Sequence, residues 1–213
     1  MRRALLIGCA NYSDAGLHAL RAPTQDVTEL AVVLEDQSIG DFDVEMLSDE
    51  PEYVVRRRIE RFFTESGPDD MLLLYLSGHG LRDEAGRLFF AARDTELGLL
   101  DSTAVSAEYI SRRMEQSFSQ RIVVVLDCCF SGAFPVGRAH KSTEQVEVST
   151  ALNGRGRAVL ASSKATEYSF EGGLLVKEEP VASVFTQERH GDQGGRRPPT
   201  GPARRARRRG GPP

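Results

Sequence analysis

One stretch, residues 122–132 with the sequence IVVVLDCCFSG, constrains the fold of this 213-residue chain more than any other. Five apolar residues, mostly β-branched, lead directly into an acid, two thiols and a Ser-Gly pair. A short apolar run with polar neighbours is typical of a strand buried on both faces of a parallel sheet. Because open α/β sheets place their chemistry at the carboxyl ends of such strands, we expect Cys128 and Cys129 to lie at a cleft.

A second apolar run, residues 71–76 with the sequence MLLLYL, leads directly into the polar SGHG of residues 77–80. This run also predicts a buried strand that ends where the polar residues begin. Residues 82–94 follow, and the Ala-Gly pair within them favours a hairpin-like turn.

Shorter strands and amphipathic helices alternate along the rest of the chain. Apolar residues recur at helical spacing in three segments. These segments begin near Pro23, at Pro51 and after a capping Ser106. Further strands are expected at residues 4–7, 42–47 and 158–161. Alternation of this kind indicates βαβ units, and therefore an α/β domain whose mostly parallel sheet is flanked by helices on both faces.

The composition is that of an ordinary globular protein, with 40% hydrophobic and 27% charged residues. No apolar run approaches the roughly 20 residues that span a bilayer, so we expect no membrane partner. Three cysteines, two of them adjacent, do not make a disulfide framework, which favours a reducing cytoplasmic location.

The composition changes abruptly after Thr186. Nineteen of the last 27 residues are Arg, Gly or Pro, and this segment contains eight arginines but only two acidic residues. Such a segment cannot bury enough apolar surface to fold, so we expect a domain over residues 1–186 and a disordered tail over residues 187–213. No aromatic residues separate the arginines, so specific binding of nucleic acid is not expected. The polar stretch 135–156 is expected to be a long loop.

The polar segments that follow the two apolar runs can meet at one edge of the sheet. Since the carboxyl ends of parallel strands share an edge, His79 and a cysteine of the 128–129 pair come together there. A thiol beside an imidazole is the arrangement that a nucleophile and its acid–base partner need. Gly78 and Gly80 are expected to let the chain turn sharply and to expose an amide to an oxyanion.

Less specific interpretations are open for the same side chains. His79 alone could be a hydrogen-bonded structural histidine, and either cysteine a small buried hydrophobe. The adjacent thiols could also form a redox pair. Zinc binding by Cys9, His79 and the cysteine pair lacks the CxxC-like spacing of zinc sites, so neither a metal nor a cofactor is predicted.

Taken together, the motifs resemble those of caspase-like cysteine peptidases, and of the metacaspase branch in particular. SGHG follows one apolar strand and D-x-C-x-S-G follows the other, and His79 and Cys129 are 50 residues apart, about the spacing found in caspases. LIGCANY near the start, with RGRAVLASS and SVFT later, extends the similarity over residues 4–186, whereas the QACRG signature of caspases is absent. The resemblance implies a caspase-like fold, a three-layer sandwich of helices, sheet and helices.

The resemblance also implies a role for each residue of the site. Cys129, the second of the pair, is the expected nucleophile, and Cys128 occupies a variable position. His79 would assist the thiol and protonate the leaving amine. The backbone amides of Gly80 and Cys129 would form the oxyanion hole.

Metacaspases cleave after Arg or Lys, and this preference implies an acidic specificity pocket. Asp26, Ser77 and Asp127 match the residues that line it. A guanidinium or ammonium group that enters a cleft is attracted by carboxylates there, which supports the match independently. Asp127 could instead end its strand, and Asp26 could be a first-turn helix acid favoured by the helix dipole.

Some metacaspases need calcium, for which Asp94 and Asp101 are the nearest candidates, but the alignment is too loose to assign a site. The leading prediction is therefore a cysteine endopeptidase whose partner is a peptide or protein substrate. The alternative is a catalytically weak or inactive caspase-like module that acts by binding proteins. Its basis is that relatives usually continue after SVFT with a helix that covers the sheet, where this chain has its Arg/Gly/Pro tail.

Overall fold

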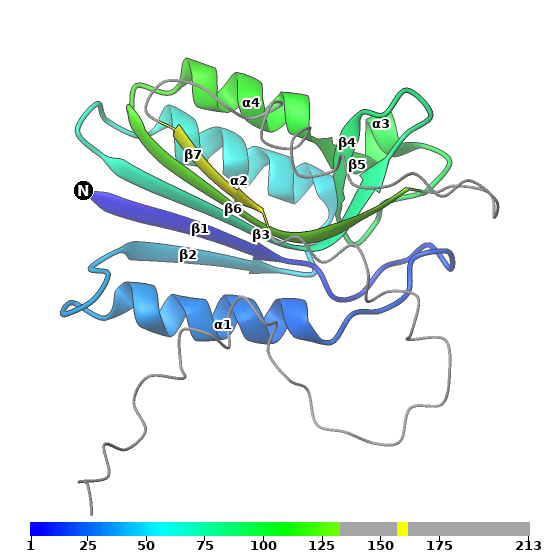
Figure 1. Ribbon diagram of the computed structural model, residues 1–213, viewed down its shortest axis with the longest axis horizontal. Coiled ribbons are helices and arrows are strands. Elements are labelled where there is room, and N and C mark those ends of the chain that lie inside the picture. Colours follow the sequence, from blue (N-terminus) through cyan, green and yellow to red (C-terminus); the bar gives the residue numbers. More distant parts are fainter. Residues whose placement is uncertain (133–156, 162–213) are drawn as a thin grey trace, which may run out of the picture.

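The computed structural model describes residues 1–132 and 157–161. These residues form one α/β sandwich (Figure 1). A mostly parallel seven-stranded sheet lies between helices on both faces, as predicted. The strands of this described part are β1 Arg2–Gly8, β2 Asp43–Ser48, β3 Met71–Arg82, β4 Leu88–Ala91, β5 Ala104–Ser106, β6 Arg121–Gly132 and β7 Arg157–Ala161. The helices are α1 Ala22–Glu35, α2 Glu52–Thr64, α3 Leu100–Thr103 and α4 Ala107–Gln116.

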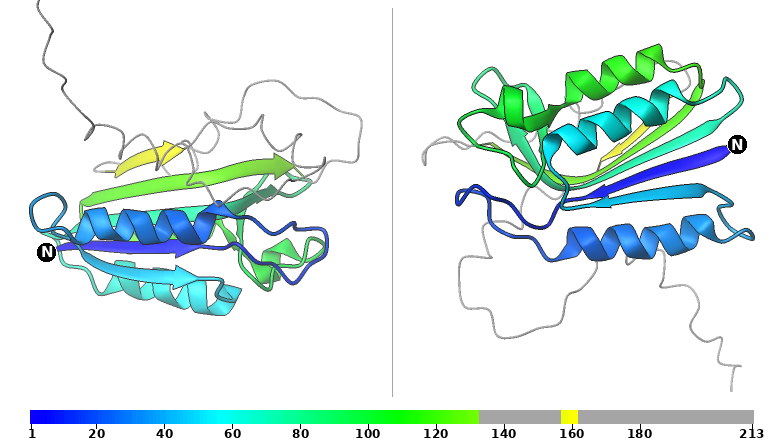
Figure 2. Two further views of the ribbon diagram at one scale, coloured as in Figure 1. Left: turned by 90° about the horizontal axis from the view of Figure 1, so that it is seen from below. Right: turned by 180° about the vertical axis from the view of Figure 1, so that it is seen from behind.

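The centre of the sheet is β3, which pairs in parallel with β1 on one side and with β6 on the other. Beyond them, β2 pairs with β1 and β7 with β6, both in parallel. The β1 ladder ends where Gly8 pairs with Ser77. The last part of β3 instead pairs with β4, which is antiparallel to it and extends the sheet through β5 (Figure 2). All parallel strands therefore present their carboxyl ends to the same edge.

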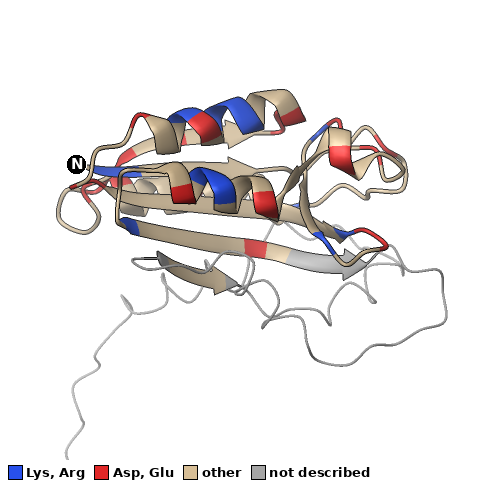
Figure 3. Cartoon of the chain, turned by 90° about the horizontal axis from the view of Figure 1, so that it is seen from above, with Lys and Arg blue, Asp and Glu red and all other residues tan. Residues whose placement is uncertain are grey.

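Side-chain alternation along the strands divides the interior into two apolar layers. In β1, Leu5 and Ile7 belong to the cluster beneath α2 and α4, whereas Ala4 and Leu6 belong to the cluster beneath α1. Basic and acidic residues are interspersed along α2 and α4 (Figure 3). Both α2 and α4 thus turn one apolar stripe to the sheet and one charged stripe to solvent.

The predicted helices are confirmed, and so are their apolar faces. In α2 the predicted stripe is buried; it consists of Val55, Ile59, Phe62 and Phe63. Ser106 caps α4, since its hydroxyl accepts a hydrogen bond from the Tyr109 amide at 3.1 Å. The start of α1 approaches β1 closely because position 8 is glycine: a Cβ there would lie 2.7 Å from the Pro23 carbonyl oxygen.

The two central strands are longer than predicted. Both were expected to end before their polar residues, at residues 76 and 126, but β3 continues to Arg82 and β6 to Gly132. The two strands stay in register over this whole length, so the sharp turn predicted at Gly78 and Gly80 is wrong. Gly80 is buried inside the strand, between β4 and β6. Asp127 also lies within β6, so the interpretation that it ends its strand is wrong.

Three predictions concern residues outside the described ranges: the loop over residues 135–156, the tail over residues 187–213 and the absence of a covering helix after SVFT. The strand predicted at residues 158–161 is present as β7. Within the described ranges, no helix has the length and apolar character that crossing a membrane requires.

Candidate active site

The register of β3 against β6 brings the predicted site residues together in pairs. His79 is the partner of Cys129, and Ser77 is the partner of Asp127. The register of β3 and β6 also makes Gly78 the partner of Cys128. The Cys129 side chain lies outside the described part of the structure, but its backbone position beside His79 is described.

Cys128 is part of the apolar core rather than of the polar pairs. Its side chain is 4% exposed and belongs to the cluster beneath α2 and α4. The thiol donates to the Leu76 carbonyl oxygen at 3.3 Å. This environment suits a small apolar side chain, as predicted for the variable position of the pair.

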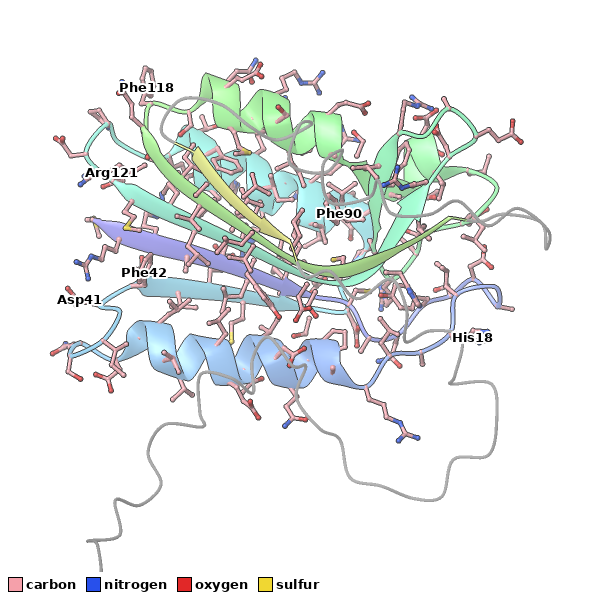
Figure 4. The ribbon with its side chains drawn as sticks, viewed as in Figure 1. His18, Asp41, Phe42, Phe90, Phe118 and Arg121 are labelled. Atoms are coloured by element: carbon pink, nitrogen blue, oxygen red, sulfur yellow. The ribbon has the colours of Figure 1, made fainter. Side chains whose placement is uncertain are left out.

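His79 is held by a backbone carbonyl that lies far from it in the sequence. Its imidazole Nε2 is 2.8 Å from the carbonyl oxygen of His18. His18 lies in the loop between β1 and α1 (Figure 4). Because a carbonyl only accepts hydrogen bonds, Nε2 is the donor, and Nδ1 is the nitrogen that can take a proton from a thiol. The arrangement supplies the third, orienting group that an imidazole base needs.

Tyr12 supports the same histidine from its backbone side. The His79 amide donates to the Tyr12 hydroxyl at 3.0 Å, and that hydroxyl donates to the Cys9 carbonyl oxygen at 2.6 Å. The two rings also lie against each other, with centroids 4.9 Å apart. Burial raises the pKa of Tyr12 above its ordinary value, so the hydroxyl keeps its proton and remains a donor.

The loop that carries Tyr12 is fixed by Asp49. The Asp49 carboxylate accepts hydrogen bonds from the Ala10 amide at 2.6 Å and from the Asn11 amide at 3.0 Å. It also accepts one from the Asn11 side chain at 2.7 Å. Cys9 begins this loop as a buried free thiol, and burial raises its pKa to about 12. The Cys9 thiol is therefore neutral and unreactive at physiological pH.

Asp26, Ser77 and Asp127 gather around the buried side chain of Tyr75. The Tyr75 hydroxyl donates to Asp127 Oδ2 at 3.2 Å. Burial raises the pKa of Tyr75, and the charges of Asp127 and Asp26 raise it further, which places both carboxylates near its hydroxyl. Asp26 is fully buried and Ser77 is 6% exposed, whereas Asp127 is partly exposed. Of the two carboxylates in this group, that of Asp127 is thus partly accessible to solvent, whereas that of Asp26 is buried.

The alternative role for Asp26, an acid in the first turn of its helix, is wrong. The helix α1 begins at Ala22, so Asp26 falls in the second turn, and the first turn holds no acidic residue. Its side chain is on the buried face of α1, directed toward the sheet rather than toward the helix dipole.

Each of the two calcium candidates has a partner in the described part of the structure. Asp94 accepts a hydrogen bond from the Glu52 amide at 2.7 Å, at the start of α2. Asp101 forms an ion pair with Arg87 at 2.9 Å. In the ranges that the structure describes, His, Cys, Asp and Glu form no group of three or more suited to a metal ion.

Sequence reasoning did not identify Tyr12, Tyr75 or the His18 carbonyl as parts of this site. Tyr12 lies inside the LIGCANY motif and Tyr75 directly precedes the LSGHG segment, so both had a signal in the sequence. The His18 carbonyl had none, because any residue supplies a carbonyl and only the path of the loop brings this one to His79.

Two solved structures have similar folds: protein GSU0716 from Geobacter sulfurreducens, with 20% identity and a TM-score of 0.49, and pro-sf-caspase-1, with 14% identity and a TM-score of 0.48. The alignments cover 62% and 66% of this chain, and it spans only 52% and 56% of those two chains. No curated protein sequence matches the chain.

The family comparison covers far more of the chain. A model of the caspase domain matches residues 1–189, a range that includes β3, β6 and the loop that holds His79. The mostly parallel sheet between two helical layers is the α/β fold expected of that domain. On this evidence of sequence and fold, the chain belongs to the caspase domain family, a family of cysteine peptidases.

Proposed function

We propose that this protein is a cysteine endopeptidase of the metacaspase type, in which Cys129 and His79 form the catalytic dyad. The observation that carries the proposal is the register of β3 and β6, which makes Cys129 the direct neighbour of His79. Neighbours on parallel strands lie about 5 Å apart, within reach of a thiol and an imidazole. Cys128 is the weaker candidate for the nucleophile because its thiol is buried in the core.

The proposed reaction has two steps. The Cys129 sulfur attacks the peptide carbonyl while Nδ1 of His79 takes the thiol proton and then delivers it to the leaving amine. A water molecule next hydrolyses the thioester, with His79 as the base, which releases the acid and regenerates the thiol. The amides of Gly80 and Cys129 are the proposed donors to the oxyanion in both steps.

We further propose that the enzyme cleaves after Arg or Lys. Asp127, partly exposed and held by Tyr75, would receive the basic side chain, with Asp26 and Ser77 behind it. A cationic side chain is the ligand that such a group attracts, whereas an aspartate side chain would be repelled. The free thiol of Cys9 supports a reducing, cytoplasmic location for this activity.

The test is hydrolysis of fluorogenic peptides that end in Arg, Lys or Asp, with and without calcium. We expect turnover of the Arg and Lys peptides, and a loss of roughly 10³-fold or more in Cys129→Ala. The matched control is Cys128→Ala, which removes the adjacent thiol from the core and should keep turnover within about threefold.

Three outcomes would contradict parts of the proposal. Unchanged turnover in Cys129→Ala would remove Cys129 as the nucleophile. Turnover of the Asp peptide alone would overturn the acidic pocket. No turnover by well-folded protein, in any condition, would favour the protein-binding module instead.

A further inference from the structure

The ladder between β1 and β3 is interrupted next to His79. Its last regular bond runs from the Cys9 amide to the Ser77 carbonyl oxygen, at 2.9 Å. In a parallel ladder the following bond would join the His79 amide directly to the Cys9 carbonyl oxygen. Here the Tyr12 hydroxyl stands between those two groups and bonds to both of them, at 3.0 and 2.6 Å. The hydroxyl therefore spaces β3 away from β1 at the residue that carries the imidazole.

Gly78 provides the room for this insertion. Its φ is +151°, a conformation that side chains disfavour. A Cβ at this position would lie 3.0 Å from the Tyr12 hydroxyl oxygen and 3.1 Å from the Cys9 carbonyl oxygen. A glycine therefore suits the position before His79 because of its own backbone conformation and because Tyr12 and Cys9 approach it closely, and not because the chain turns there.

Tyr12 can act as a rigid spacer because its own position is fixed on both sides. Residues 10 and 11 are bound to the Asp49 carboxylate, and the Ser13 amide donates to the Arg93 carbonyl oxygen at 2.8 Å. The Tyr12 ring lies against the imidazole, 4.9 Å between centroids, while the His18 carbonyl holds Nε2. Backbone and ring of His79 are each anchored to the same loop.

We propose that Tyr12 is a positioning residue, whose hydroxyl sets the distance of His79 from β1 and so its alignment with Cys129. Without the hydroxyl, the His79 amide can bond directly to the Cys9 carbonyl, which would draw β3 toward β1. The inference rests on the proposed role of His79 as the base. Displacements of about 1 Å can cost on the order of 100-fold in rate.

The test is Tyr12→Phe, which removes the hydroxyl and keeps the ring. We expect kcat on an Arg peptide to fall about 10- to 100-fold while KM stays within about twofold, because the acidic pocket is untouched. The matched control is Tyr109→Phe: this buried hydroxyl donates to the Arg56 carbonyl oxygen at 2.9 Å, between α4 and α2 and away from the site. The melting temperature of Tyr109→Phe should fall about as much as that of Tyr12→Phe, but its kcat should be unchanged.

A second readout does not depend on turnover. The NMR signals of the His79 amide and imidazole should shift in Tyr12→Phe and stay in place in Tyr109→Phe. Unchanged kcat and unchanged His79 signals in Tyr12→Phe, or an equal loss of kcat in both variants, would overturn the inference. If the wild-type protein has no peptidase activity, the proposed function fails; the His79 signals alone then decide whether Tyr12 sets the position of this residue.

Discussion

The two faces of the sheet differ most where β3 and β6 approach their carboxyl ends. Toward α2 and α4, Leu76 and Cys128 continue the apolar core. Toward α1, the neighbouring residues Tyr75 and Asp127 are joined by a hydrogen bond, close to the buried Asp26. The same two strands thus supply both environments, one residue apart, because side chains alternate between the faces.

Under the proposed function, this difference separates residues that stabilise the fold from residues that take part in catalysis, within a single pair of strands. Substitutions on the face toward α2 and α4 should change the free energy of unfolding, with little effect on the proposed turnover by the folded protein. Substitutions of the polar residues near the carboxyl ends of β3 and β6, such as Asp127 and His79, should lower the proposed turnover and change the free energy of unfolding less. A substitution on the α2–α4 face that abolished turnover of a stable protein would contradict this division of the two faces.

The largest effect is expected from His79→Ala. In the proposed mechanism the imidazole is both the base for the thiol and the acid for the leaving amine, so its loss should lower kcat/KM by about 10²- to 10⁴-fold. Loss of its hydrogen bond to the His18 carbonyl should cost about 1 kcal/mol, which should lower the melting temperature by only about 2–4 °C. Peptidase assays and calorimetry on the same preparation check this, and a variant that keeps its activity would contradict the assignment.

Ile59→Ala should have the next largest effect, and on stability alone. Ile59 is fully buried in α2 and contributes to the cluster beneath α2 and α4. Its truncation should reduce the free energy of unfolding by about 2–5 kcal/mol, measured by urea denaturation. The control is Val32→Ala on α1, where the side chain is 66% exposed and the change should be about 0.5 kcal/mol or less. Equal losses in the two variants would contradict the assignment of the core.

Asp127→Asn keeps the shape of the side chain and removes its charge. Cleavage after Arg should fall about 30-fold, mostly through KM, which corresponds to roughly 2 kcal/mol. Cleavage after citrulline, the uncharged analogue of arginine, should change much less. The control is Asp101→Asn, whose carboxylate pairs with Arg87 in the described structure. An unchanged ratio of Arg to citrulline cleavage would show that Asp127 does not select the cation.

Asp49→Asn should give the smallest effect, and one that depends on pH. Burial raises the pKa of Asp49, but hydrogen bonds from Asn11 and Ala10 outweigh it and hold the pKa below its ordinary value. Because the pKa is lower in the folded protein, the carboxylate stabilises the fold above about pH 4 and loses this contribution as the pH falls through the folded value. The variant should therefore lose about 1 kcal/mol at pH 7 and less at pH 3. Equal losses at both pH values in urea denaturation would contradict this account.

The sequence predicted the elements of the fold well because each has a local signal. The apolar faces of α1, α2 and α4 follow from helical spacing, and the cap at Ser106 from its residue type. The ends of β3 and β6 could not be predicted in the same way. Polar residues and glycines normally end a strand, but here pairing between the two strands continues through them.

The site was predictable to the extent that its parts have distinctive side chains. The strand register brings His79 beside Cys129, the pair that the motifs suggested. It also brings Ser77 beside Asp127, two of the three residues that the resemblance assigned to one pocket. The Tyr12 bridge and the His18 carbonyl depend on how residues 9–21 cross the edge of the sheet, which no local pattern encodes.

The most direct measurement is to react the protein at pH 7 with a peptidyl chloromethyl ketone that ends in Arg, and to map the adduct by mass spectrometry. The account predicts one adduct on Cys129, no adduct after His79→Ala and none on Cys128 or Cys9, which are 4% and 5% exposed. Fragmentation of the labelled peptide distinguishes the adjacent cysteines. An adduct on Cys128, or equal labelling of Cys128 and Cys129, would contradict the central claim that the two faces of this sheet divide core from chemistry.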